Sequence, residues 1–80
     1  MGICCGSELE DAKYHGSGLT PNLAVIDLIN NMKNHGCIEI KTDGLNYEPP
    51  YLEFKTHSDY KYRVNINFKR INDLMWAWVN

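Results

Sequence analysis

The chain has 80 residues, of which 44% are hydrophobic and 22% are charged, and its formal net charge is −2. This length predicts one small domain, and this composition is that of an ordinary soluble globular protein. Intrinsic disorder, a membrane-spanning chain and an overall basic nucleic-acid-binding protein are therefore excluded as classes.

The three cysteines predict reduced thiols and not a disulfide-stapled secreted fold. Their number is odd, and Cys4 and Cys5 are adjacent, a spacing that strains a mutual disulfide. No signal-peptide pattern opens the chain. We therefore expect a cytoplasmic protein.

Residues 1–18 are expected to form a flexible arm or a short capped helix that precedes the domain. Ser7 and Glu10 make a capping-box pattern, and Gly16 is placed to stop a helix. The remaining residues, 19–80, are expected to form a single α+β domain.

Residues 19–36 carry the clearest signal in the chain, that of an amphipathic helix. Thr20 can accept hydrogen bonds from the free amides of the first turn, and Pro21 suits the first helical position. Gly36 is placed to end the helix in a Schellman-type stop. Apolar residues recur at i, i+3, i+4 and i+7 on the face expected to be buried: Val25, Leu28, Ile29 and Met32. Polar residues fall on the opposite face, which we expect to be solvated: Asp27, Asn30, Asn31 and Asn34.

After this helix the period changes from helical to alternating, which predicts three strands. Residues 37–41, 51–56 and 60–68 alternate between apolar and polar side chains. In the first of these strands Ile38 and Ile40 are expected to point into the core. The short connections favour an antiparallel meander.

The last stretch, residues 70–80, is expected to be a second helix. Its apolar residues again recur at i, i+3, i+4 and i+7: Ile71, Leu74, Met75 and Trp78. The predicted fold class is therefore α+β, a three-stranded antiparallel β-sheet (meander) with two helices packed on one face, in the order α-β-β-β-α.

No stretch matches a catalytic or cofactor-binding motif, so we expect a non-enzymatic protein-binding module that needs no cofactor. The one grouping of triad residue types, His57-Ser58-Asp59, is consecutive in a turn, where the side chains cannot converge. Such a module acts as an inhibitor, adaptor or regulatory subunit. Exposed aromatics beside rigid prolines bury much area at small entropic cost, and an acidic arm attracts a basic partner. The expected contact residues are Tyr47, Glu48, Tyr51, Trp76, Glu8, Glu10 and Asp11.

Nucleic-acid binding is the first alternative, because residues 55–70 hold five basic residues and a single acidic one. This basic strip consists of Lys55, Lys61, Arg63, Lys69 and Arg70. The predicted order of elements resembles that of the double-stranded RNA-binding domain in topology. It departs from that family in its basic residues, because the loop of residues 42–50 has none and the last helix opens with only two.

Two further alternatives concern the membrane and self-association. Gly2, Cys4 and Cys5 would allow N-terminal acylation and attachment to a membrane surface, although position 6 holds Gly6 where the usual motif has Ser or Thr. A homodimer through strand or helix contacts is the other alternative.

A zinc site is the weakest alternative. The chain holds enough soft ligands, but it lacks the paired Cys-x2-Cys spacing that is typical of structural zinc sites. The residues concerned are Cys4, Cys5, His15, His35 and Cys37.

Overall fold

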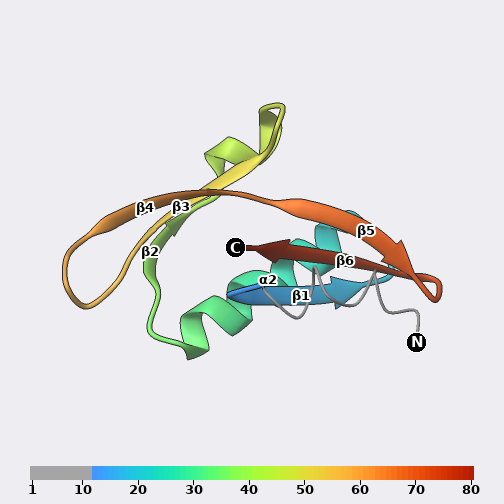
Figure 1. The fold of residues 1–80 in the computed structure, drawn as a ribbon, viewed down its shortest axis with the longest axis horizontal. Coiled ribbons are helices and arrows are strands. Elements are labelled where there is room, and N and C mark those ends of the chain that lie inside the picture. The colour runs from blue at the N-terminus through green and yellow to red at the C-terminus, as the bar shows by residue number, and fades with distance from the viewer. Residues whose placement is uncertain (1–11) are drawn as a thin grey trace.

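Residues 12–80, the part of the chain described by the computed structural model, form one α-helix and six β-strands in two three-stranded antiparallel sheets (Figure 1). The first sheet has the strand order β1-β6-β5, and the second has the order β2-β3-β4. The predicted architecture of one sheet with two helices is therefore wrong. In chain order the elements are β1 (Tyr14–Gly18), α2 (Pro21–Asn34), β2 (Ile38–Lys41), the 3₁₀-helix η1 (Asp43–Asn46), β3 (Tyr51–Lys55), β4 (Lys61–Asn65), β5 (Asn67–Ile71) and β6 (Leu74–Val79).

Helix α2 confirms the strongest sequence prediction. At its start the Thr20 hydroxyl accepts a hydrogen bond from the Leu23 amide at 3.2 Å. At its end the Cys37 amide donates to the Met32 carbonyl at 3.0 Å, and Gly36 has a φ of 92°. These two features make the predicted Schellman stop. The buried face consists of Ala24, Val25, Leu28 and Met32.

Two side chains on the polar side of α2, those of Asp27 and Asn31, form hydrogen bonds with the backbone of β1. The prediction that they are only solvated is therefore corrected. The Ser17 amide donates to Asp27 Oδ2 at 3.0 Å, and Asn31 Nδ2 donates to the His15 carbonyl at 2.6 Å. Strand β1 is an edge strand of the first sheet. Two of its backbone groups, the Ser17 amide and the His15 carbonyl, are therefore bonded by helix side chains and not open to another chain.

Strand β1 is built from residues that the sequence places in the arm. Gly16 faces α2, and a Cβ atom added to it would lie 2.1 Å from the Leu28 backbone nitrogen. Gly18 is similarly close to the backbone of α2 at Ala24. The missing side chains allow the helix to lie almost on the strand.

Strand β6 replaces the helix predicted for residues 70–80. It is the middle strand of the first sheet, with Ala77, Trp78 and Val79 buried. Ala77 and Val79 belong to the core, and the alternate residues Leu74, Trp76 and Trp78 are also apolar. The run Leu74–Val79 therefore lacks the strict alternation that marks a strand in the sequence. The preceding two residues, Asn72 and Asp73, both have positive φ, as a type I′ hairpin turn requires.

The long alternating stretch of residues 60–68 is divided between the two sheets. Strand pairing is interrupted at Ile66, so that β4 belongs to the second sheet while β5, which follows it directly, joins the first (Figure 1). The Ile66 amide donates to the Pro50 carbonyl at 2.9 Å, and the Ile66 side chain is buried. This one ribbon therefore links the two sheets.

Both sheets and the helix share one hydrophobic core, so the described chain is a small, compact single domain. Its members come from α2, both sheets and their connections: Ala24, Val25, Leu28, Met32, Cys37, Leu52, Phe54, Ile66, Ala77 and Val79. Within residues 12–80, α2 is too short and too polar to cross a membrane.

Candidate protein-binding face

Strand β2 contains one extra residue, and this changes which of its side chains meet solvent. Ile38 lies opposite Lys55, whereas Lys41 lies opposite Glu53, so three steps along β2 match two along β3. This β-bulge includes Glu39, whose φ of 50° is left-handed. Directly opposed residues point to the same face of a sheet. Ile38 and Lys41 therefore both point to the side of Lys55 and Glu53.

The strict alternation predicted for this strand is consequently wrong at Ile38, which is 45% exposed, and right at Ile40, which packs against the core. The bulged strand and the alternate residues of β3 and β4 make one surface, which we call the outer face. Its side chains are those of Ile38, Lys41, Tyr51, Glu53, Lys55, Lys61 and Arg63.

Tyr47, Tyr51 and Arg63 lie in contact at one end of the outer face, and we call them the tyrosine–arginine cluster. The two tyrosine rings are tilted by 50° with their centroids 5.5 Å apart, and the Arg63 Cζ atom lies 3.8 Å from the centroid of the Tyr51 ring. The second of these is a cation–π contact, and the Arg63 side chain is exposed, so its guanidinium can also donate hydrogen bonds to a ligand. Sequence reasoning assigns the tyrosines and the arginine to different functions, but the structure places all three together.

The absence of a side chain at Gly44 in η1 leaves room for the Tyr51 ring. A Cβ atom at Gly44 would lie 2.4 Å from the Tyr51 ring, and Gly44 is buried. An Asp-Gly pair in a sequence indicates a turn and nothing about packing, so this role of Gly44 has no local signal. Lys41 is also absent from the predicted contact residues, although its place at the polar end of a predicted strand is a signal that could have revealed it.

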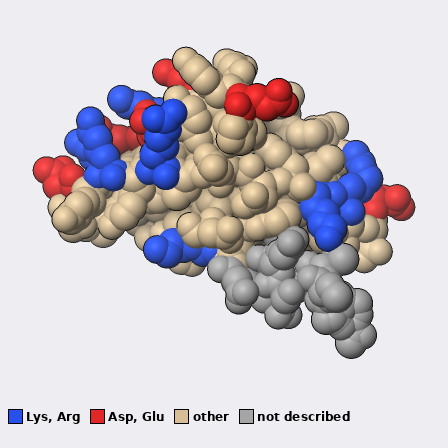
Figure 2. Space-filling model, turned by 45° about the horizontal axis from the view of Figure 1, so that its top comes forward, with Lys and Arg blue, Asp and Glu red and all other residues tan. Residues whose placement is uncertain are grey.

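The basic strip predicted for nucleic-acid binding is split between the sheets. Lys55, Lys61 and Arg63 lie on the outer face, whereas Lys69 and Arg70 lie on β5 in the first sheet. Figure 2 shows the Lys and Arg side chains of one face of the molecule gathered mainly at two opposite ends, each with acidic side chains beside it. No continuous basic track runs along the visible surface.

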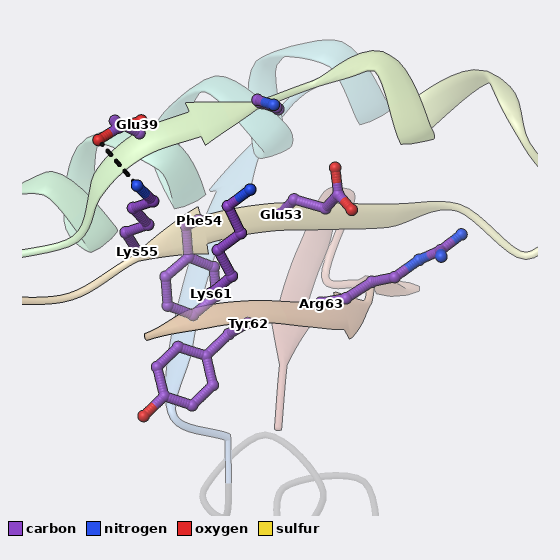
Figure 3. Close-up of a pocket in the computed structure, with 8 residues that line it drawn as sticks. Glu39, Glu53, Phe54, Lys55, Lys61, Tyr62 and Arg63 are labelled. Atoms are coloured by element: carbon purple, nitrogen blue, oxygen red, sulfur yellow. Dashed lines mark ion pairs between the residues drawn. The ribbon is translucent and has the colours of Figure 1, made fainter. Parts of the chain in front are cut away.

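The charged side chains of β2, β3 and β4 surround a hollow of about 170 Å³ (Figure 3). The rings of Phe54 and Tyr62 lie on the opposite side of the strands from Lys61 and Glu53 (Figure 3). Besides Phe54 and Tyr62, the hollow is lined by four cationic residues, Lys41, Lys55, Lys61 and Arg63, and by two acidic ones, Glu39 and Glu53. The side chains that line the hollow therefore carry a net positive charge.

Among residues 12–80, the ion pairs made by the cations of the hollow are those of Lys55. Its Nζ atom lies 3.5 Å from Glu39 Oε2 and 3.8 Å from Asp59 Oδ1. Lys61 lies directly opposite Lys55, and like charges that face each other across two strands destabilise the sheet. Within residues 12–80, neither Lys61 nor Lys41 has a carboxylate oxygen within 4 Å. These two ammonium groups are therefore available to an anionic partner.

The remaining predicted contact residues lie elsewhere. Trp76 is half-buried on β6, where its ring centroid lies 5.9 Å from that of His15. Glu48 is exposed in the loop between η1 and β3. Glu8, Glu10 and Asp11 lie outside the described residues, as do the acylation candidates Gly2, Cys4 and Cys5.

The zinc alternative gains no support from the described residues. His35 lies at the end of α2, with Nδ1 2.8 Å from the Asn31 carbonyl oxygen, and Cys37 is buried. Residues 12–80 contain no group of three or more histidine, cysteine or acidic side chains placed to hold a metal ion.

A second aromatic cluster lies on the core side of the second sheet. The rings of Tyr14 and Phe54 meet edge to face at 6.3 Å, and Phe54 stacks on Tyr62 at 5.4 Å. A hydrogen bond with Cys37, then burial, then the negative charges of Cys37 and Tyr62 raise the pKa of Tyr14 to about 12. Tyr14 therefore stays neutral and keeps its packing role in ordinary conditions.

The described chain is thus a two-sheet α+β domain with a mixed-charge, tyrosine-bearing outer face. No protein-family model, curated protein or solved structure matches it.

Proposed function

We propose that the chain is a small non-enzymatic module that binds another protein through its outer face, and that it acts as an inhibitor, adaptor or regulatory subunit. The observation that carries this proposal is the contact among Tyr47, Tyr51 and Arg63, in which Tyr47 is 62% exposed. Tyrosine and arginine are enriched among the residues that dominate binding energy at protein interfaces. Side chains that already contact one another in the free protein lose less entropy on binding than side chains without such contacts.

The mixed charge of the outer face favours a protein over a nucleic acid. Glu39 and Glu53 lie among the cations, so a phosphate backbone crossing the hollow would meet two carboxylates. A protein surface can instead match charges of both signs. Nucleic-acid binding remains the second candidate, because proteins that bind single strands also combine aromatic rings with cationic side chains.

Affinity capture from source cells tests the proposal. The full chain carries a C-terminal tag and is compared with the variant Arg63→Glu and the matched control Arg70→Glu, which reverses an exposed charge on β5. Each capture is made with and without nuclease. We expect the unmodified chain and Arg70→Glu each to recover one partner protein in an amount nearly equal to that of the tagged chain. Arg63→Glu should recover at least about tenfold less of this partner.

Two results would contradict the proposed function or its location. Recovery that disappears with nuclease, together with a steep fall of affinity with salt, would assign the outer face to nucleic acid. Equal recovery by both variants would place the binding surface away from the outer face.

A further inference from the structure

Strand β4 is at the edge of the second sheet, and its backbone pairing can be deduced from one hydrogen bond. The Ile66 amide bonds to the Pro50 carbonyl just beyond the last residue pair of β3 and β4. In an antiparallel ladder, hydrogen-bonded and non-hydrogen-bonded pairs alternate. Val64 and Tyr62 therefore share with Ile66 the orientation in which N–H and C=O point to β3.

The intervening residues have the opposite orientation. The backbone N–H and C=O groups of Lys61, Arg63 and Asn65 point away from β3, toward the free side of β4. All three residues are exposed, and no strand among residues 12–80 pairs with this side. The edge is therefore a row of unpaired backbone groups, the usual template for strand addition.

The side chains of β4 determine which strand fits this edge. Lys61 and Arg63 point to the outer face, and Lys61 has no ion-pair partner among the described residues. On the other face Tyr62 is 41% exposed and contacts the ring of Tyr60 at 6.0 Å. An added strand would therefore meet positive charge on one face and tyrosine rings on the other.

We propose that β4 binds an extended segment of the partner protein as an additional antiparallel strand, and that this segment alternates acidic and apolar residues. Its acidic side chains lie opposite Arg63 and Lys61, where opposite-charge cross-strand pairs are stabilising. Its apolar side chains cover Tyr62 and Tyr60. This inference rests on the proposed function and names the partner chemistry and the mode of binding.

A second copy of the chain does not fit the same edge. Two β4 strands paired antiparallel about their middle residue would place Arg63 opposite the Arg63 of the other copy, and like charges directly opposite are destabilising. Exposed cations on an edge strand are a usual defence against self-pairing. The same charges that reject a copy select an acidic strand.

The test uses a short synthetic peptide of alternating glutamate and valine, blocked at both ends, titrated into the ¹⁵N-labelled full chain. Because Glu8-Leu9-Glu10 has the same acidic–apolar–acidic pattern, the chain carries Glu8→Gln and Glu10→Gln to prevent competition. Two further peptides are N-methylated, one at its glutamates and the other at its valines. In the proposed pairing the glutamate N–H groups face β4 and the valine N–H groups face away.

We expect N-methylation of glutamate to weaken binding at least about tenfold, and N-methylation of valine to change it less than about threefold. Amide exchange should slow at Lys61, Arg63 and Asn65. Equal losses with both methylated peptides would mean side-chain contact without strand addition, which overturns this inference and leaves the proposed function standing. Absence of binding by the unmodified peptide also overturns it, while the capture experiment with Arg63→Glu decides the proposed function separately.

Discussion

At the scale of single residues, Gly16 shows how tightly the helix and the first sheet are packed. A Cβ atom at this position would overlap the backbone of α2 at Leu28, and backbone cannot rotate away as a side chain can. We expect Gly16→Ala to lower the free energy of unfolding by about 3 kcal/mol or more, measured by urea denaturation.

Ser17→Ala is the matched control for this prediction. The hydrogen bond of Ser17 to Asp27 uses its backbone amide, so the substitution should change stability by less than about 0.5 kcal/mol. Similar values for the two variants would mean that β1 does not lie against α2 as described.

Tyr14 should ionise at a higher pH than an ordinary tyrosine, because its pKa is raised. The hydrogen bond with Cys37, burial and nearby negative charge raise its pKa from 10.0 to about 12. A raised native pKa means that the stabilisation is fully present below pH 10 and is lost between pH 10 and 12, because the unfolded state then releases the proton first.

Absorbance at 295 nm, followed from about pH 9 to 13, measures this ionisation. The unmodified chain should show a late component that is missing in Tyr14→Phe, and its stability should fall more steeply with pH than that of the variant. A titration in which the late component persists in Tyr14→Phe would assign it to another tyrosine.

At the scale of elements, the turn between β5 and β6 determines the position of the central strand. Asn72 and Asp73 have φ values of 51° and 67°, which only glycine adopts without a steric penalty. Asp73→Gly makes the Asn-Gly pair preferred in type I′ turns. We expect a gain of up to about 1 kcal/mol, seen as a higher melting temperature.

The control for the hairpin is Asp43→Gly, since Asp43 begins η1 and is not a positive-φ position. Glycine there adds only conformational freedom to the unfolded chain, so stability should fall. If Asp73→Gly also lowered the melting temperature, the turn would not be of the I′ type.

The contact between α2 and the edge of β1 gives a second prediction at this scale. Asp27→Ala leaves the Ser17 amide without its side-chain acceptor, at a cost of about 1–3 kcal/mol. Asn30→Ala, on the exposed side of the same helix, should be neutral or slightly stabilising. Equal effects in thermal unfolding would argue against the edge contact.

At the scale of the whole molecule, the chain passes from one sheet to the other at Ile66, and we expect the two sheets to unfold as one cooperative unit. Ile66 is 4% exposed and packs in the shared core. We expect Ile66→Ala to cost about 2–4 kcal/mol and to lower the stability of both sheets together. Tryptophan fluorescence reports on β6 in the first sheet, and NMR amide signals of β3 report on the second.

The two probes should give coincident unfolding transitions, both shifted in the variant. Asn65→Ala, one residue earlier and exposed, is the control and should shift neither by much. Separate midpoints for the two probes would show that the sheets unfold independently.

The candidate site was partly accessible from the sequence. Tyr47 and Tyr51 beside the prolines, and Arg63 on an alternating strand, are found by composition and period alone. Their contact was not accessible, because it depends on Gly44 and on the pairing of β3 with β4. The exposure of Ile38 depends on the bulge at Glu39, and a one-residue shift in register has no signature in the sequence.

The features that could be predicted from the sequence are those that local chemistry encodes. Thr20, Pro21 and Gly36 place the ends of α2, because caps act within one turn, and the alternating stretches place β2, β3 and β4. The identity of β1 and β6 depends instead on contacts between distant parts of the chain. A short apolar run such as Leu74–Val79 suits a buried strand or a helix equally, and the glycine-containing strand β1 exists because α2 and β6 lie against it. Where a segment has a weak preference, or suits a helix and a strand equally, contacts between residues distant in sequence select its structure. Burial in the shared core outweighs the small differences in intrinsic propensity.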